Sequence, residues 1–272
     1  MSVLVPTAVS TVPVSTTWGT PVDTLKATDI QYDEGYSPKS GPPPLIKTSE
    51  TQLDFEGDYA VQEGDILLPT DRNSVSELWA ELDGSLSVPY EIDSVIEGRT
   101  KDILNAFNMI SKKTCVRFRP HTNETDYLHF ELGNGCASYV GCRGGEQPLL
   151  IGPKCKVGNI CHEILHALGF HHEHSRYDRG DHITILKGNI ASGKEDNFLK
   201  RNGNTFGLEY DLESILHYGN NYFSRNGKPT IQPKDSGVII GQRTHLSDLD
   251  VQRIRKLYHC GTSCALIIPG LL

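Results

Sequence analysis

The stretch His162-Glu163-Ile164-Leu165-His166-Ala167-Leu168-Gly169-Phe170-His171-His172 decides how this chain folds. On a helix, positions four apart are displaced by only ~40° around the axis, so His162 and His166 project from one face. Gly169 suits a left-handed residue that ends the helix and turns the chain, which brings His172 toward the same point. The spacing therefore predicts that three imidazoles meet at one ion.

Three histidine ligands leave a fourth position for water, as a catalytic zinc ion requires. Glu163 lies beside the first ligand, where its carboxylate is expected to act as general base on that water. The alternative is a polar helix whose histidines face solvent. The short pattern HExxH arises by chance in roughly one such chain in 40, but the added Gly169 and His172 lower that to about one in ten thousand. The sequence therefore predicts one catalytic Zn²⁺ at His162, His166 and His172, and gives His171 and His174 no role.

Length and composition set bounds on the rest. The chain has 272 residues, 37% hydrophobic and 22% charged, with a net charge of −8. This composition is typical of a globular protein, and the acidic balance argues against a nucleic-acid partner. No apolar run approaches the ~20 residues of a membrane-spanning helix.

The cysteines favour a secreted protein. All seven lie between Cys115 and Cys264, and six between Cys115 and Cys260, which suits a disulfide-stapled extracellular domain. Residues 1–17 form an atypical signal segment, because they are apolar but lack a basic start and contain two prolines. Asn123 begins a glycosylation sequon, Asn123-Glu124-Thr125.

Local patterns predict a loose leading segment followed by one α+β domain. Residues 18 to about 60 are polar and rich in turn formers, so they are expected to be extended or poorly ordered. Four apolar residues at helical spacing predict a helix around residues 103–110, and residues 115–119, 127–132 and 149–152 are strand candidates. Ser247 with Asp250 indicates the start of a last helix, whose apolar stripe ends at Tyr258.

The stretch from His162 to Arg179 resembles the astacin family of zinc endopeptidases, within the metzincins. Gly169-Phe170, Glu173, Arg176, Asp178 and Arg179 carry the likeness, and similar segments are Cys115–Phe118, Cys136–Gly141, Ser214–Tyr218 and Gly241–Arg243. With six cysteines up to Cys260, the chain resembles the six-cysteine fish astacins, the group that includes hatching enzymes. The resemblance implies a twisted mixed sheet and the zinc helix in an N-terminal half, and an irregular C-terminal half ending in a helix.

The resemblance also implies roles for individual residues. Tyr218 would assist the oxyanion of the tetrahedral intermediate, against the alternative of a partly buried core tyrosine. Glu173 would anchor the mature N-terminus. Arg243 would favour acidic residues beyond the scissile bond, although a surface arginine is an equal alternative. Leu216 replaces the family's methionine in the turn beneath the zinc, a swap of similar volume that the site is expected to survive.

A latent form is expected as well. Phe55-Glu56-Gly57-Asp58 resembles the family's pro-segment motif, so Asp58 is predicted to block the open zinc position, with an acidic loop as the alternative. An activating protease would cut near Arg72-Asn73. The expected organisation is a signal segment at 1–17, a pro-segment at 18–72, the catalytic domain at 73–260 and a tail at 261–272.

Family analogy further pairs Cys115 with Cys260, Cys136 with Cys155 and Cys142 with Cys161, leaving Cys264 odd. Two buried free thiols are the alternative for the third pair. The expected function is that of a secreted zinc-dependent endopeptidase made as a zymogen and acting on extracellular proteins such as an egg coat. Two other readings stay open: a binding protein with this fold that has lost catalysis, and another kind of metzincin.

Overall fold

The computed structural model describes residues 48, 50–51, 55–56, 59–69, 77–80 and 86–261 of the chain. All of them belong to one compact unit, Pro42–Leu272. The predictions for residues 1–17, Asp58, the Arg72-Asn73 bond and Cys264 lie outside the described residues.

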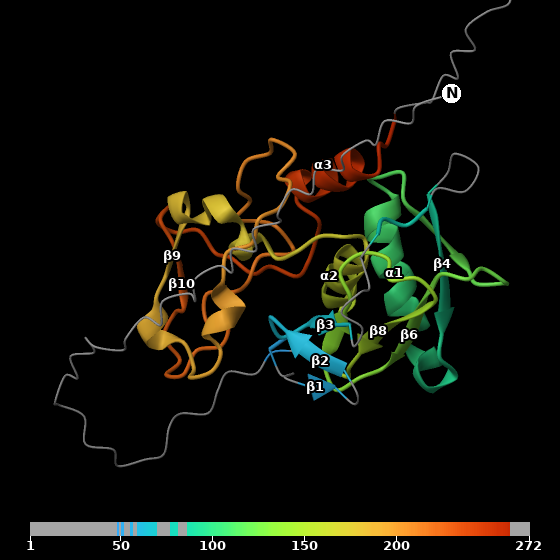
Figure 1. Cartoon of the computed structure of the whole chain (residues 1–272), viewed down its shortest axis with the longest axis horizontal. Helices are drawn as coiled ribbons and strands as arrows, with labels where there is room; N and C mark the ends of the chain where they lie inside the picture. The colour runs from blue at the N-terminus through green and yellow to red at the C-terminus, as the bar shows by residue number, and fades with distance from the viewer. Residues whose placement is uncertain are drawn as a thin grey trace, which may run out of the picture. The chain divides into compact units, whose positions relative to one another are not determined.

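A mixed sheet of eight strands forms the first half of this unit (Figure 1). Its strands are β1 (Phe55–Glu56), β2 (Tyr59–Gln62), β3 (Ile66–Leu68), β4 (Ser87–Ile92), β5 (Arg117–Pro120), β6 (Tyr127–Leu132), β7 (Cys136–Ser138) and β8 (Glu146–Ile151). Their order is β1-β2-β3-β7-β8-β6-β4-β5. Strands β8, β6, β4 and β5 pair in parallel, whereas β7 runs antiparallel to β8.

Strands β1 to β3 lie within the predicted pro-segment at 18–72, and β1 lies in its part up to about residue 60 that was expected to be loose. They form because β3 pairs with the free edge of β7, in parallel, with Ile66 opposite Ser138. Ser138 N–H donates to the carbonyl oxygen of Asp65 at 2.9 Å. The hydrogen-bonding partner for this polar segment is thus supplied by the domain that follows it.

Three helices were expected and are found: α1 (Thr100–Ser111), α2 (Val157–Ala167) and α3 (Asp248–Leu257). The four apolar residues predicted to form one face of α1 are all buried. Helices α1 and α2 lie side by side, and α2 packs on β7 and β8 (Figure 1). Ser247 and Asp250 make the predicted capping box at the start of α3. Among the described residues, no helix has the length and apolarity needed to cross a membrane.

The C-terminal half is irregular, as expected. It contains the 3-10 helices η2 (Glu173–Ser175), η3 (Tyr177–Asp181), η4 (Lys187–Asn189) and η5 (Glu195–Phe198), and the strand pair β9 (Ile183–Ile185) and β10 (Ile231–Pro233). One more 3-10 helix, η1 (Ser94–Arg99), precedes α1. A small second core surrounds Tyr218, Phe198 and Phe223. The α+β class and the division into a sheet half and an irregular half are therefore confirmed.

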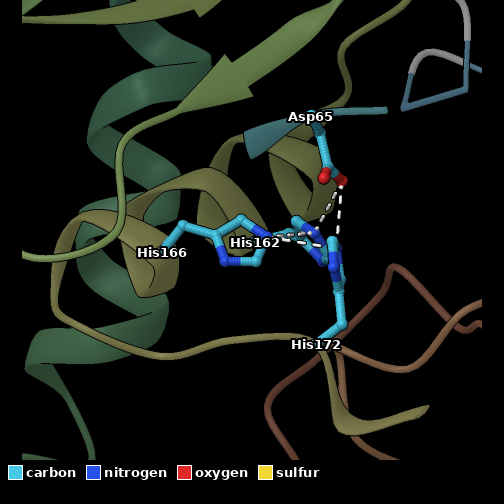
Figure 2. A group of neighbouring side chains, drawn as sticks. All are labelled: Asp65, His162, His166 and His172. Atoms are coloured by element: carbon cyan, nitrogen blue, oxygen red, sulfur yellow. Dashed lines mark hydrogen bonds and ion pairs between the residues drawn. The ribbon is translucent and has the colours of Figure 1, made fainter. Parts of the chain in front are cut away.

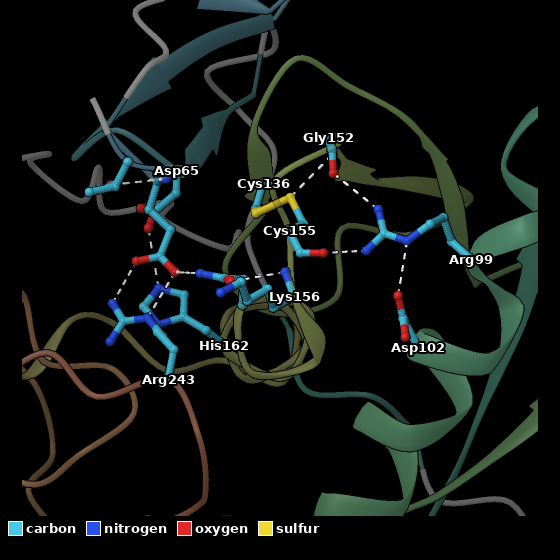
Figure 3. Close-up of a disulfide and its surroundings, with 12 residues drawn as sticks. Asp65, Arg99, Asp102, Cys136, Gly152, Cys155, Lys156, His162 and Arg243 are labelled. Atoms are coloured by element: carbon cyan, nitrogen blue, oxygen red, sulfur yellow. Dashed lines mark hydrogen bonds and ion pairs between the residues drawn. A yellow bond between two sulfur atoms is a disulfide. The ribbon is translucent and has the colours of Figure 1, made fainter. Parts of the chain in front are cut away.

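Two of the three predicted disulfides are present. Cys115 bonds to Cys260 and Cys136 to Cys155. The second bond joins β7 to the start of the zinc helix, beside Arg99, which donates to the carbonyl oxygens of Gly152 and Cys155 (Figure 3).

The predicted Cys142–Cys161 bond is wrong, because both residues are free and buried thiols. Cys142 is held by a backbone bridge to Glu77, and its charged neighbours include Glu77 and Asp126. Cys161 lies on α2, where burial raises the thiol pKa and its charged neighbour is Asp250 of α3. The two side chains therefore lie in different surroundings.

Candidate metal centre

Helix α2 and the turn after it bring the three predicted histidines together. Gly169 has φ +105°, the left-handed conformation predicted for it. The Nε2 atom of His166 is 3.0 Å from that of His162 and 3.2 Å from that of His172. All three side chains are buried. The chain reversal at Gly169 thus carries His172 back to the helix face that holds the other two (Figure 2).

Hydrogen bonds on the far side of each ring fix where the lone pairs are. His162 Nδ1 is 2.8 Å from the carbonyl oxygen of Ile215, and His166 Nδ1 is 2.7 Å from that of Phe170. His172 Nδ1 is 2.7 Å from Oε2 of Glu63. Because those oxygens only accept, each Nδ1 donates, and each neutral ring keeps a lone pair on Nε2. Three lone pairs that converge so closely form a group that could hold a metal cation.

The fourth group at this point is Asp65, which lies just ahead of β3 and faces the histidines (Figure 2). Its Oδ2 is 3.2 Å from Nε2 of His162 and 3.2 Å from Nε2 of His172. Ligands at ~2.0–2.1 Å from a tetrahedral zinc ion are roughly 3.3 Å apart, so these spacings fit zinc. Asp65 and the three histidines form the described group that is best suited to hold a metal ion.

Asp58 was the residue predicted for that fourth position, and the described carboxylate there is Asp65. Glu-Gly-Asp occurs twice in this segment, at residues 56–58 and 63–65. Only the second copy runs directly into a strand that pairs with β7. That pairing fixes Asp65 at the metal site, whereas Asp58 lies outside the described residues.

Glu163 has the surroundings of a general base. It is fully buried, and neither carboxylate oxygen has a hydrogen-bond partner among the described residues. Burial raises the pKa of Glu163 well above its ordinary value, and the nearby Asp65 and Glu50 raise it further. A buried acceptor of this kind needs a proton donor, which a water at the metal would provide.

Tyr218 is fully buried next to the metal site. Its hydroxyl donates to the backbone carbonyl oxygen of Glu63 at 2.5 Å. Burial raises the pKa of Tyr218 well above its ordinary value, so the phenol is a proton donor at neutral pH. In this structure the donor is occupied by the segment ahead of β3.

Glu63 makes hydrogen bonds through its side chain and its backbone. It was not identified as a site residue from the sequence. One carboxylate oxygen accepts from His172 and the other from Arg201 Nε at 2.5 Å. Its backbone N–H donates to Asn197 Oδ1 at 3.2 Å. Burial alone would raise the pKa of Glu63, but His172, His174 and Arg201 lower it to about 2. The only signal in sequence was its place in the second Glu-Gly-Asp.

The side chain of Arg243 is only 10% exposed, and it binds a second carboxylate of the leading segment. Its Nε and Nη2 donate to Glu50 at 2.8 and 2.6 Å, and Asn159 and Tyr222 donate to the same side chain. Burial alone would raise the pKa of Glu50, but Arg243 lowers it far below its ordinary value. Glu50 also approaches His162 and Glu163, so this carboxylate site borders the metal centre.

Glu173 and Leu216 lie on the other side of the centre. Glu173 accepts from Arg253 at 2.7 Å, from Arg176 at 3.2 Å and from the backbone N–H of Asp211 at 2.7 Å. Burial raises the pKa of Glu173 to about 7, although Arg253 and Arg176 act to lower it. A cavity of 360 Å³ opens beside these residues, and Leu216 lines it. Leu216 is buried in the same core as α2, as expected for a methionine substitute.

Asn123, the predicted glycosylation site, is exposed in the loop before β6.

Comparisons with known proteins agree with this geometry. The family model described as astacin, a peptidase family, matches residues 72–259. The chain is 45% identical over 197 residues to zinc metalloproteinase nas-14 of Caenorhabditis elegans and 39% identical over 216 residues to embryonic protein UVS.2 of Xenopus laevis. These alignments cover 68% and 76% of this chain, but only 38% and 42% of the relatives.

Among solved structures, high choriolytic enzyme 1, a hatching enzyme zinc-protease of Oryzias latipes, is 37% identical. Its TM-score is 0.66, and the match covers 69% of this chain and all of that one. The catalytic-domain fold is thus shared with a solved zinc-protease. Since the family model spans more than half of the sequence, this chain belongs to the astacin family.

Proposed function

We propose that this chain is a secreted zinc-dependent endopeptidase made in a latent form. The observation that carries the proposal is the three converging Nε2 lone pairs beside a buried Glu163 whose carboxylate has no described partner. His162, His166 and His172 would hold the ion. When bound, zinc supplies a Lewis acid for the substrate carbonyl and lowers the pKa of a water molecule.

The chain's own residues perform the proton transfers. Glu163 takes a proton from the attacking water and passes it to the leaving amine. The Tyr218 hydroxyl donates a hydrogen bond to the oxyanion that forms on the substrate carbonyl. The substrate would lie along the edge of β7, where the paired segment lies now.

Latency follows from three contacts of residues 50–66. Asp65 takes the fourth ligand position, the carbonyl of Glu63 holds Tyr218, and β3 covers the edge of β7. Cleavage near Arg72-Asn73 would let this segment leave. Glu173, at the cavity, would then anchor the new N-terminus through its carboxylate.

Arg243 would select acidic side chains on the substrate. Glu50 supports this role, because it is a peptide carboxylate already bound there by two guanidinium nitrogens. Bidentate binding by arginine favours a carboxylate over a neutral side chain. The substrates would be extracellular proteins, and the similarity to a hatching enzyme makes an egg-coat protein one of them. The two disulfides support an extracellular location.

The test is casein cleavage by the purified chain before and after trypsin treatment, with and without a zinc chelator. We expect cleavage only after trypsin, its loss with chelator, and its return with added zinc. E163A should bind one zinc but cleave nothing. A folded, zinc-loaded wild-type chain that cleaves nothing after trypsin would favour the binding-protein alternative.

A further inference from the structure

His174, two residues after the last predicted ligand, lies flat against the ring of Tyr218. The two ring centroids are 3.7 Å apart and the planes differ by 24°. The other aromatic rings around Tyr218 are more distant or more steeply inclined, with His172 at 4.7 Å and 61° and Tyr222 at 4.9 Å and 42°. His174 is therefore the ring that stacks most closely on the phenol of Tyr218.

His174 itself is fixed on several sides. Its Nε2 donates to the carbonyl oxygen of Asn197 at 2.9 Å, and its own carbonyl oxygen accepts from Arg179 at 2.9 Å. The side chain is fully buried. Nδ1 has no hydrogen-bond partner among the described residues, so the bond from Nε2, the bonded backbone carbonyl and burial fix the orientation of the ring.

These contacts do not depend on the leading segment. Tyr218 donates its hydroxyl to Glu63, and that bond ends when the segment leaves. Asn197, Arg179, His174 and Tyr218 all belong to residues 73–260, so both rings and the groups that hold His174 remain in the chain after activation. The stack of His174 on Tyr218 is the closest ring contact of the phenol.

The stacked imidazole of His174 restricts how the phenol ring of Tyr218 can move. A displacement of the phenol and its hydroxyl toward His174, perpendicular to the ring, would drive the ring face into the imidazole 3.7 Å away. The hydroxyl can still move within a plane parallel to the imidazole. An oxyanion donor is effective only when it is held in place before the charge forms.

We propose that His174 is a positioning residue that aligns Tyr218 for oxyanion stabilisation. This inference rests on the proposed endopeptidase function. It gives the histidine a role that its spacing in the zinc motif does not predict.

The experiment compares H174L, which removes the flat ring, with H174F, which keeps it, in the trypsin-cleaved full chain. Losing an aromatic pair changes an equilibrium by roughly two- to tenfold, so kcat of H174L should fall by about that factor with KM nearly unchanged. H174F should retain most of the kcat. H182L is the matched control, because His182 makes a comparable histidine–tyrosine stack on Tyr210, with the ring centroids 4.7 Å apart. It should leave kcat unchanged.

A double-mutant cycle separates positioning from general stability. Y218F should lower kcat by roughly a hundredfold, and H174L should add nothing in the Y218F background. Binding of a phosphinic peptide, measured by calorimetry, gives a readout without turnover, and H174L should weaken it only where Tyr218 is present. If H174L does not fold, H174Q replaces it in the cycle.

Equal losses from H174L with and without Tyr218 would overturn the inference and leave a purely structural histidine. Unchanged kcat in H174L would overturn it too. Full activity in Y218F would instead remove the proposed role of Tyr218, and inactivity of the wild-type chain would remove the proposed function.

Discussion

The hydroxyl of Tyr218 donates to the backbone carbonyl oxygen of Glu63 at 2.5 Å, so the segment that covers the metal site also engages the expected oxyanion donor. The carboxylate of the same glutamate binds His172 and Arg201. One residue thus contacts a metal ligand and Tyr218 together. In the proposed latent form, this segment therefore contacts the site through more than the carboxylate of Asp65.

The first prediction concerns Asp65. In an R72Q chain that trypsin leaves uncut at this site, D65A frees the fourth ligand position but not Tyr218. We expect fluorogenic peptide hydrolysis above that of the uncut parent, yet roughly a hundredth or less of the cleaved enzyme's kcat/KM, because an oxyanion donor is worth about 10²–10³ in rate. D58A should stay fully latent. Activation by D58A and not by D65A would contradict the assignment.

The convergence of the three histidines was predictable because its geometry is local. His162, His166 and His172 fall within eleven residues, and helix periodicity with one left-handed glycine places all three. The capping box of Ser247 and Asp250 was predictable for the same reason. Each of these signals needs only a few neighbouring residues.

The position of Asp65 at the metal site was not predictable in this way. The two Glu-Gly-Asp copies are alike over three residues, and the choice between them depends on strand β3 meeting β7 about 70 residues later. The thiols of Cys142 and Cys161 are a second example, since spacing does not say which way a side chain points. Arg243 was ambiguous because its partner, Glu50, is nearly 200 residues earlier.

The second prediction concerns substrate choice. R243Q in the cleaved enzyme removes the two donors that now bind Glu50. Hydrogen bonds to a charged group contribute about 1.5–3 kcal/mol, so kcat/KM for a peptide with glutamate beyond the scissile bond should fall roughly 10- to 100-fold. A matched glutamine peptide should change little. R225Q, at an exposed position, is the control, and equal losses on both peptides would argue against an acidic subsite.

The third prediction is a pH dependence at the surface. Arg176 donates to Asp178 at 2.9 and 2.7 Å, and these bonds lower the pKa of Asp178 below its ordinary 3.8. When the pKa of a carboxyl group is lower in the folded state than in the unfolded state, the group stabilises the fold at pH values above its unfolded pKa. This stabilisation is lost as the pH falls through the folded-state pKa. D178N should therefore lower the free energy of unfolding at pH 7, by less than ~1 kcal/mol because the pair is partly exposed.

The matching measurement is urea unfolding of the uncut chain at several pH values from 7 downward. The difference between D178N and the parent should shrink as the pH passes below 3.8. D235N, at an exposed aspartate, should show no such trend. A D178N effect that is constant with pH would show that the ion pair is not its cause.

The fourth prediction concerns the cysteines. Alkylation of the denatured, non-reduced chain should label Cys142 and Cys161, while peptide mass spectrometry finds the Cys115–Cys260 and Cys136–Cys155 links. In the native chain Cys161 should resist labelling, because burial raises its pKa and blocks access. A Cys142–Cys161 cross-linked peptide would contradict the structure.

The last prediction tests the turn that carries both Glu63 and Asp65. Gly64 has φ +83°, and a Cβ there would overlap the carbonyl oxygen of Glu50 and lie 2.7 Å from Cζ of Phe223. G64A should therefore displace the blocking carboxylate, the Glu63 carbonyl and Glu50 together.

Gly237 offers a matched control, since its φ is +84° and no atom lies within 4 Å of its added Cβ. G237A carries the same backbone strain of about 1–2 kcal/mol without a collision. In uncut R72Q chains we expect G64A to cleave peptide faster than D65A does, because Tyr218 is released as well, while G237A stays latent. After trypsin cleavage of the corresponding Arg72 chains, G64A and the parent should be equally active, since the altered residue leaves with the segment. Continued latency of uncut G64A would mean that the segment holds the cleft without this turn.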